Sequence, residues 1–237
     1  MKKIRKILRK LLHRGFTNQD EYINYLRKKG IQIGKNCRIY DCNKVNIDTQ
    51  NPWMLTMGDN VRITEGVQIL THDYSFSVLC SVKGDVVGSV EKTTIGNNIF
   101  IGRNAIILKG VCIGDNVIIG AGSVVTSDCE SNYVYAGNPA KKICSIEKLY
   151  EKRKAVEIEN AKQVAISYYK KTNNIPPKDV LREYQMIFEK RDSIPDSLNE
   201  LFKDSGVYEL CEKNFYNTKP TFECYEDFLK WCGILSK

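Results

Sequence analysis

The chain has 237 residues, of which 42% are hydrophobic and 27% charged, an ordinary composition for a folded globular protein. This composition excludes collagen-like, low-complexity and wholly disordered chains, and no apolar stretch is long enough for a transmembrane helix. The nine cysteines form no CxxC pair and have no histidine at zinc-site spacing, so we expect reduced thiols, no metal and a cytoplasmic protein.

The net charge of +8 is concentrated at the N-terminus. Residues 1–29 contain ten Lys or Arg and two acidic residues, which accounts for +8 and leaves the rest of the chain neutral. A nucleic-acid-binding protein spreads its basic residues over a folded face, so we expect no nucleic-acid partner. The short apolar run is interrupted by His13 and Arg14, so we expect no secretory signal.

Residues 1–29 predict a helical segment in two parts. In residues 1–14, seven cations and no acid surround an apolar stripe with helical spacing, formed by Ile4, Ile7, Leu8, Leu11 and Leu12. This pattern suits peripheral contact with the anionic inner face of a membrane; the alternative is that the stripe packs against the protein. A second helix is predicted over residues 18–29, with Thr17 as its N-cap and Gly30 as its stop.

A six-residue repeat occupies the middle of the chain. Its later apolar anchors are Ile95, Ile101, Ile107, Ile113, Ile119 and Val125, and its earlier ones are Ile33, Ile39, Val45, Met57, Ile63 and Ile69. A period of six fits neither a helix nor an extended strand, but it does fit a short strand followed by a tight turn. Three such strands make one triangular coil, so we expect a short prism of four or five coils.

The repeat changes phase once, and one of the two histidines stands at that point. Ile69 and Ile95 are 26 residues apart, which predicts a loop over about residues 70–94. His72 lies where this loop begins, and a neutral imidazole can take a proton from a hydroxyl near neutral pH. The alternative is a turn histidine without a catalytic part. We expect Asp73 to be exposed rather than to orient the imidazole, because adjacent side chains diverge.

The remaining residues, 144–237, predict a helical extension rather than a linker. Charged and apolar residues alternate from about 145 to 171, and shorter helical pieces are predicted near 178–190, 196–203 and 222–232.

The segment TIGNNIFIGRNAIILKGVCIGDNVIIGAGSVVTSDCESNYVYAGNPAKKI, which begins at Thr94, resembles the hexapeptide-repeat acyltransferases. Its GAGSVVT and AGNPAK parts resemble the branch of maltose, galactoside and capsular-polysaccharide O-acetyltransferases. The resemblance implies a mainly β fold, a left-handed parallel β-helix over residues 30–143, with an extruded loop and helical flanks. It also implies a homotrimer that binds acetyl-CoA in a groove between subunits.

The same resemblance implies residues for the site. His72 would be the general base. Ala121 and Thr126 would lie near the pantetheine, with Ser127 beside them. Lys141 would face the CoA phosphates, and Arg103, where relatives have a small polar residue, would be a further phosphate contact.

The function that follows is acetyl-CoA-dependent transfer of an acetyl group to a sugar hydroxyl, in the biosynthesis of a surface polysaccharide. One alternative is N-acetylation of an amino sugar, because the same base and donor serve an amine. A second is an antibiotic-type acetyltransferase. A third, of a different class, is a non-catalytic trimeric scaffold whose helices bind partners.

Overall fold

The computed structural model describes residues 15–236, so the predicted basic helix over residues 1–14 lies outside the described part. The chain divides into two compact units, Met1–Lys148 and Leu149–Lys237. Over residues 15–236, no helix combines the length and the apolar character that crossing a bilayer requires.

Helix α2, Gln19–Lys29, precedes the β-structure and packs its apolar face into the core of the first coil. The prediction that Thr17 caps this helix is wrong by one residue. Asn18 is the N-cap, and its side chain accepts a hydrogen bond from the backbone N–H of Glu21. Thr17 instead donates its N–H and its hydroxyl to the Glu21 carboxylate, which fixes the entry of the chain. Gly30 ends the helix with a left-handed φ of 113°, as predicted.

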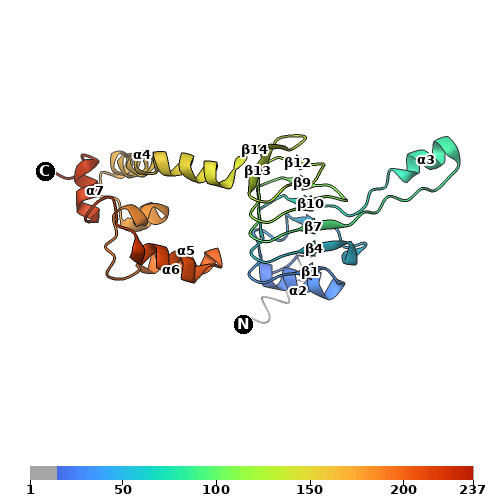
Figure 1. The fold of residues 1–237 in the computed structure, drawn as a ribbon, viewed down its shortest axis with the longest axis horizontal. Helices are drawn as coiled ribbons and strands as arrows, with labels where there is room; N and C mark the ends of the chain where they lie inside the picture. The colour runs from blue at the N-terminus through green and yellow to red at the C-terminus, as the bar shows by residue number, and fades with distance from the viewer. Residues whose placement is uncertain (1–14, 237) are drawn as a thin grey trace. The chain divides into compact units, whose positions relative to one another are not determined.

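The first unit is a stack of triangular coils built from three sheets of short strands (Figure 1). The first sheet contains β1 (Gln32–Ile33), β4 (Leu55–Met57), β7 (Thr93–Ile95) and β10 (Cys112–Ile113). The second contains β2 (Arg38–Ile39), β5 (Arg62–Ile63), β8 (Phe100–Ile101), β11 (Ile118–Ile119), β13 (Tyr133–Ala136) and β14 (Lys141–Ser145). The third contains β3 (Asn46–Ile47), β6 (Gln68–Ile69), β9 (Ile106–Ile107) and β12 (Val124–Val125). Every pairing is parallel except that of β13 with β14.

From β1 to β12, successive strands belong to successive sheets, so the chain turns at three corners. We call the passage from the first to the second sheet the first corner, from the second to the third the second corner, and from the third back to the first the third corner. Except for Ile33, which is half-buried, the predicted anchors are buried in the core, for example Ile101, Ile107 and Ile119, each 0% exposed. The six-residue period therefore reflects one inward apolar side chain per strand, and the structure confirms it.

The first coil corrects one predicted anchor. Ile47, not Val45, lies opposite Ile69 in the third sheet. The interval from Ile39 to Ile47 is eight residues instead of six, because the turn Asp41–Lys44 enlarges the second corner there. This slip of two residues changes which side chains of the first coil meet those of the second at the third corner.

The first corner carries an asparagine ladder. Five asparagines adopt left-handed φ angles between 52° and 69°, and each side-chain amide bonds the next at 2.8 to 3.0 Å: Asn36, Asn60, Asn98, Asn116 and Asn132. Asparagine tolerates this conformation better than other residues with a side chain, and its amide can both donate and accept. The ladder therefore closes the corner and ties each coil to the next.

Replacing Asn98 with alanine should lower the free energy of unfolding by about 2 kcal/mol, because it removes two ladder bonds and leaves a Cβ at positive φ. Asn98→Gly is the matched control, since it loses the same bonds without the conformational strain, and it should cost about 1 kcal/mol. Urea unfolding measures both variants. Equal losses would show that backbone strain is not what asparagine relieves there.

A loop leaves the prism between β6 and β7 and carries the helix α3, Phe76–Lys83 (Figure 1). Its two stems pair with each other: the N–H of Asp73 donates to the Ser89 carbonyl at 3.2 Å, and that of Glu91 to the Thr71 carbonyl at 3.0 Å. No residue of α3 is buried within the described chain. A short 3₁₀ helix, η1 (Pro52–Met54), lies in the connection between β3 and β4, which is also longer than a regular corner.

The second unit is helical. Its elements are α4 (Ile146–Thr172), the 3₁₀ helix η2 (Lys178–Ile187), α5 (Asp196–Ser205), α6 (Tyr208–Asn217) and α7 (Tyr225–Trp231). Phe188 and Phe228 pack with Ala161 and Ala165 of α4 in its main core. Helix α6 was not predicted; it begins two residues after Gly206, whose φ of 79° ends α5.

Candidate active site

The central feature of the first unit is a histidine–carboxylate pair at the third corner. Asp48 directly follows β3, and His72 follows β6 by three residues, so adjacent coils present the two side chains to each other. The Nδ1 atom of His72 is in hydrogen-bond contact with Oδ2 of Asp48. The side chains are 15% and 6% exposed, respectively, so the pair is largely shielded while the imidazole keeps some access to solvent.

Asp48 is held by more than the histidine. Its Oδ2 also accepts from the N–H and the hydroxyl of Thr71, at 3.1 and 2.5 Å, and its Oδ1 accepts from the N–H of Gln50 at 2.9 Å. Burial by itself raises the pKa of Asp48, but the hydrogen bonds from Thr71, Gln50 and His72 outweigh burial and lower that pKa below its ordinary value. The carboxylate is therefore ionised near neutral pH.

An ionised carboxylate can only accept, so Nδ1 of His72 is the protonated nitrogen. The Nε2 atom then carries the lone pair and is the atom that can take a proton from a substrate. A carboxylate in this position also stabilises the imidazolium that forms after proton transfer. This geometry gives the imidazole a fixed tautomer and a fixed ring orientation, which is what a general base requires.

The stems that frame His72 are tied to the next coil by Lys109, which follows β9. Its Nζ lies 2.7 Å from Oε1 of Glu91 and 3.4 Å from Oδ2 of Asp73, one carboxylate on each stem. Gly110 makes room for this arrangement, because a Cβ there would meet the Glu91 carboxylate at 2.5 Å. The hydrogen bond to Glu91 raises the pKa of Lys109, so the cation persists throughout the neutral range.

Asp73 does not orient the imidazole. Its Oδ1 accepts from the N–H and the hydroxyl of Ser75, at 2.9 and 2.5 Å, and its Oδ2 faces Lys109. The Ser75 hydroxyl, the Ser75 N–H and Lys109 lower the pKa of Asp73 to about 2. Asp73 therefore stabilises the first turn of the loop.

Lys109→Met should loosen both stems at once, because it leaves two neighbouring carboxylates without their shared cation. We expect hydrogen exchange at the Asp73 and Glu91 amides to accelerate by up to about fivefold, in line with the modest worth of exposed ion pairs. Lys109→Arg, which keeps the charge, is the control. Unchanged exchange in Lys109→Met would show that backbone pairing alone holds the stems.

Three of the predicted donor-site residues gather at the second corner. Arg103 follows β8 and Ala121 follows β11, and the N–H of Gly122 donates to the Arg103 carbonyl at 2.7 Å. Lys141 begins β14, opposite Ala136, which occupies the same corner one coil further on. The Arg103 side chain is 72% exposed, and its Nη2 atom lies 3.7 Å from Oε2 of Glu65. Lys141 is also exposed.

The other two predicted donor-site residues lie at the third corner with His72. Thr126 and Ser127 follow β12, and both are exposed. Backbone hydrogen bonds link Leu70 to Ile107 and Leu108 to Val125, so this corner runs continuously from the His72 coil to the Thr126 coil. The third sheet of one chain thus lies between the two sets of predicted donor residues.

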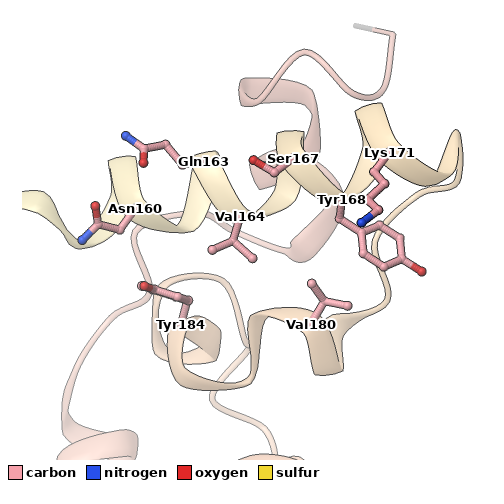
Figure 2. A pocket seen from close by; sticks show the side chains of 8 residues that line it. All are labelled: Asn160, Gln163, Val164, Ser167, Tyr168, Lys171, Val180 and Tyr184. Carbon is pink, nitrogen blue, oxygen red and sulfur yellow. The ribbon is translucent and has the colours of Figure 1, made fainter.

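A cavity of about 580 Å³ lies in the second unit, between α4 and η2 (Figure 2). Val164 of α4 and Val180 and Tyr184 of η2 line it, with Lys171 at one end. None of its eight lining side chains is a histidine or a carboxylate.

Comparisons with known proteins identify the family of the chain. Residues 92–127 match the family described as bacterial transferase hexapeptide (six repeats). Protein CapG of Staphylococcus aureus is 39% identical over 144 residues, which are 61% of this chain and 80% of CapG. The chain belongs to the hexapeptide-repeat acyltransferase family.

Other members of the family are also similar. Galactoside O-acetyltransferase of Escherichia coli K12 is 37% identical over 116 residues, which are 49% of this chain and 54% of that enzyme. A solved structure of galactoside acetyltransferase in complex with coenzyme A is 25% identical, with a TM-score of 0.46, and covers 62% of this chain and 80% of its own. The predicted family and fold class, the left-handed parallel β-helix of hexapeptide repeats with helical flanks, are confirmed.

Sequence reasoning missed Asp48. A regular coil of three six-residue strands has 18 residues, which would place Asp48 opposite Gly66, before the loop begins. In the structure, Ile47 pairs with Ile69, and this register places Asp48 beside Thr71 and His72. The available signal was the lengthened interval between the apolar residues Ile47 and Met57, ten residues instead of six.

Proposed function

We propose that the chain is an acetyl-CoA-dependent O-acetyltransferase that acetylates a sugar hydroxyl, with His72 as general base and Asp48 as its orienting carboxylate. The observation that carries this proposal is the His72–Asp48 pair on a hexapeptide-repeat prism. A hydroxyl is a poor nucleophile at neutral pH, whereas a thioester is already activated, so a positioned base is the principal catalytic requirement.

The reaction follows from this arrangement. Nε2 of His72 removes the proton of the acceptor hydroxyl as its oxygen attacks the thioester carbonyl, and a C–O bond forms. The carbon–sulfur bond of the tetrahedral intermediate then breaks, and the imidazolium returns the proton to the departing thiolate. Asp48 stabilises the imidazolium between the two steps, and a base of this kind contributes about 10²–10⁴-fold.

The donor site is proposed to form between subunits of a homotrimer. Arg103, Ala121 and Lys141 line the second corner, whereas Thr126 and Ser127 share the third corner with His72. A neighbouring subunit that faces its second corner to the third corner of this one would unite both sets in one groove. The exposed apolar side chains of α3, among them Val78 and Val82, support an intersubunit contact of the loop.

The acceptor class rests on similarity. The Escherichia coli relative is named for O-acetylation of a galactoside, which supports a sugar hydroxyl over an amine. The place in surface-polysaccharide biosynthesis follows from the resemblance of the GAGSVVT and AGNPAK segments to that branch of the family. We assign the chemistry to residues 30–143 and treat residues 144–237 as an appended helical domain.

The apolar stripe and the seven cations of residues 1–14 are proposed to bring this enzyme, which we propose is cytoplasmic, to the inner face of the membrane. Glycans are built on lipid carriers there. Co-sedimentation with anionic vesicles at low and high salt tests this. Binding at low salt that is lost at high salt supports the proposal, and failure to bind at either salt concentration contradicts it.

Calorimetric titration of the full chain with acetyl-CoA and with CoA tests the donor. We expect micromolar binding with one site per chain. A folded protein that binds neither compound would contradict the proposal and favour the non-catalytic scaffold.

A further inference from the structure

An exposed tyrosine is held in a fixed position beside the catalytic base. The Tyr74 ring lies 5.0 Å from the His72 ring, centroid to centroid, with an interplanar angle of 87°. Its hydroxyl donates to Oε1 of Gln50 at 2.7 Å. The Tyr74 residue is nevertheless 62% exposed, so one side of a large apolar surface faces outward within the described chain.

Gln50 connects this ring to Asp48, the carboxylate that orients His72. Its backbone N–H donates to Oδ1 of Asp48, whose other oxygen holds His72. The same carboxylate therefore positions the base and, through Gln50, the tyrosine. Because the Gln50 oxygen accepts from Tyr74, its amide N–H groups remain as donors at an exposed position.

This combination has a recognisable chemistry. A pyranose ring presents a patch of C–H bonds on one face and hydroxyls around its edge. An aromatic ring fits the C–H face, and an amide N–H fits a ring hydroxyl as acceptor. A rigid ring loses little entropy on binding, and here the hydrogen bond to Gln50 has already fixed it.

We propose that the Tyr74 ring and the Gln50 amide form the acceptor subsite, which takes a pyranose with its C–H face on Tyr74 and a hydroxyl at Nε2 of His72. This inference rests on the proposed acetyl transfer and goes beyond it, because it names the residues that select the acceptor class. Phe76, whose ring lies 6.0 Å from that of Tyr74, supports the platform from the loop side.

Saturation-transfer NMR on the full chain with saturating CoA tests the subsite. The probes are the methyl pyranosides of glucose, galactose, mannose and N-acetylglucosamine, with chloramphenicol as a planar aromatic acceptor of another class. We expect at least one pyranoside to bind and to show its strongest saturation on the C–H protons of one face. Tyr74→Ala should weaken that binding by about 5–10-fold, Gln50→Ala by about threefold, and Tyr74→Phe by about twofold, since the ring remains.

Tyr216→Ala, at an exposed tyrosine of α6, is the matched control and should leave sugar binding unchanged. Two results would overturn the subsite: sugar binding unaffected by Tyr74→Ala, whether or not the oligomeric mass changes, or binding of no pyranoside, with or without binding of chloramphenicol. Failure of the proposed acetyl transfer is distinguishable from failure of the subsite. It would appear as absent binding of acetyl-CoA and CoA to the wild-type protein in the calorimetric titration.

Discussion

His72→Ala is expected to lower kcat for acetyl transfer by about 10²–10⁴-fold while the Kd for acetyl-CoA stays unchanged. The substitution removes the atom that accepts the hydroxyl proton, and it leaves the predicted donor residues at the second corner untouched. A spectrophotometric assay of CoA thiol release measures the rate, and calorimetry measures the donor affinity. Asp48 keeps its hydrogen bonds from Thr71 and Gln50 when His72 is replaced, so the substitution should not unfold the prism.

The control is His13→Ala, which replaces the other histidine of the sequence and should leave kcat within about twofold. Full activity in His72→Ala would contradict the assignment of the base even though the fold is that of an acyltransferase. Equal loss in both variants would point to a general effect of histidine removal rather than to proton transfer at the third corner.

Asp48→Asn should cost about 10²–10³ in kcat, because an amide no longer enforces the tautomer in which Nε2 of His72 carries the lone pair. The amide also cannot accept every bond that Thr71 and Gln50 donate to the carboxylate. The pH dependence has a definite sign. Since the pKa of Asp48 is lowered on folding, its hydrogen bonds stabilise the protein above the ordinary carboxyl value and are lost as the pH falls through the lower folded value.

Asp73→Asn is the matched control for this prediction, because Asp73 adjoins His72 in the sequence but bonds to Ser75 and Lys109. It should loosen the loop and reduce kcat by no more than about threefold. If Asp73→Asn impairs catalysis as strongly as Asp48→Asn, the orienting effect does not belong to Asp48. Rate assays with both variants at one donor concentration, together with thermal unfolding, separate the two outcomes.

Much of the architecture follows from local sequence. Each strand contributes one inward apolar side chain, so the spacing of residues such as Ile101 and Ile119 predicts the triangular coil from the sequence alone. The phase change after Ile69 locates the loop, and the position of His72 at its start is the reason for proposing this residue as the base. These signals are accessible because a repeat protein is held together by contacts between neighbouring coils.

The rest depends on register, which single residues do not reveal. Asp48 meets His72 because Ile47 pairs with Ile69, an offset of 22 residues instead of the 18 of a regular coil. Lys109 reaches both loop stems because they pair with each other. That pairing joins residues far apart in the sequence, so no local pattern predicts it. Tyr74 and Gln50 are 24 residues apart and meet through the same register.

The most direct test of sugar O-acetylation by this protein is to identify the product of the reaction. The full chain is incubated with acetyl-CoA and a mixture of neutral pyranosides and amino sugars, and mass spectrometry follows the addition of one acetyl group before and after mild alkali. We predict that a neutral pyranoside gains an acetyl group that alkali removes, as expected of an ester. An alkali-stable acetyl group found only on amino sugars, or no acetylation by a protein that binds acetyl-CoA, would contradict O-acetylation of a sugar by the His72–Asp48 pair.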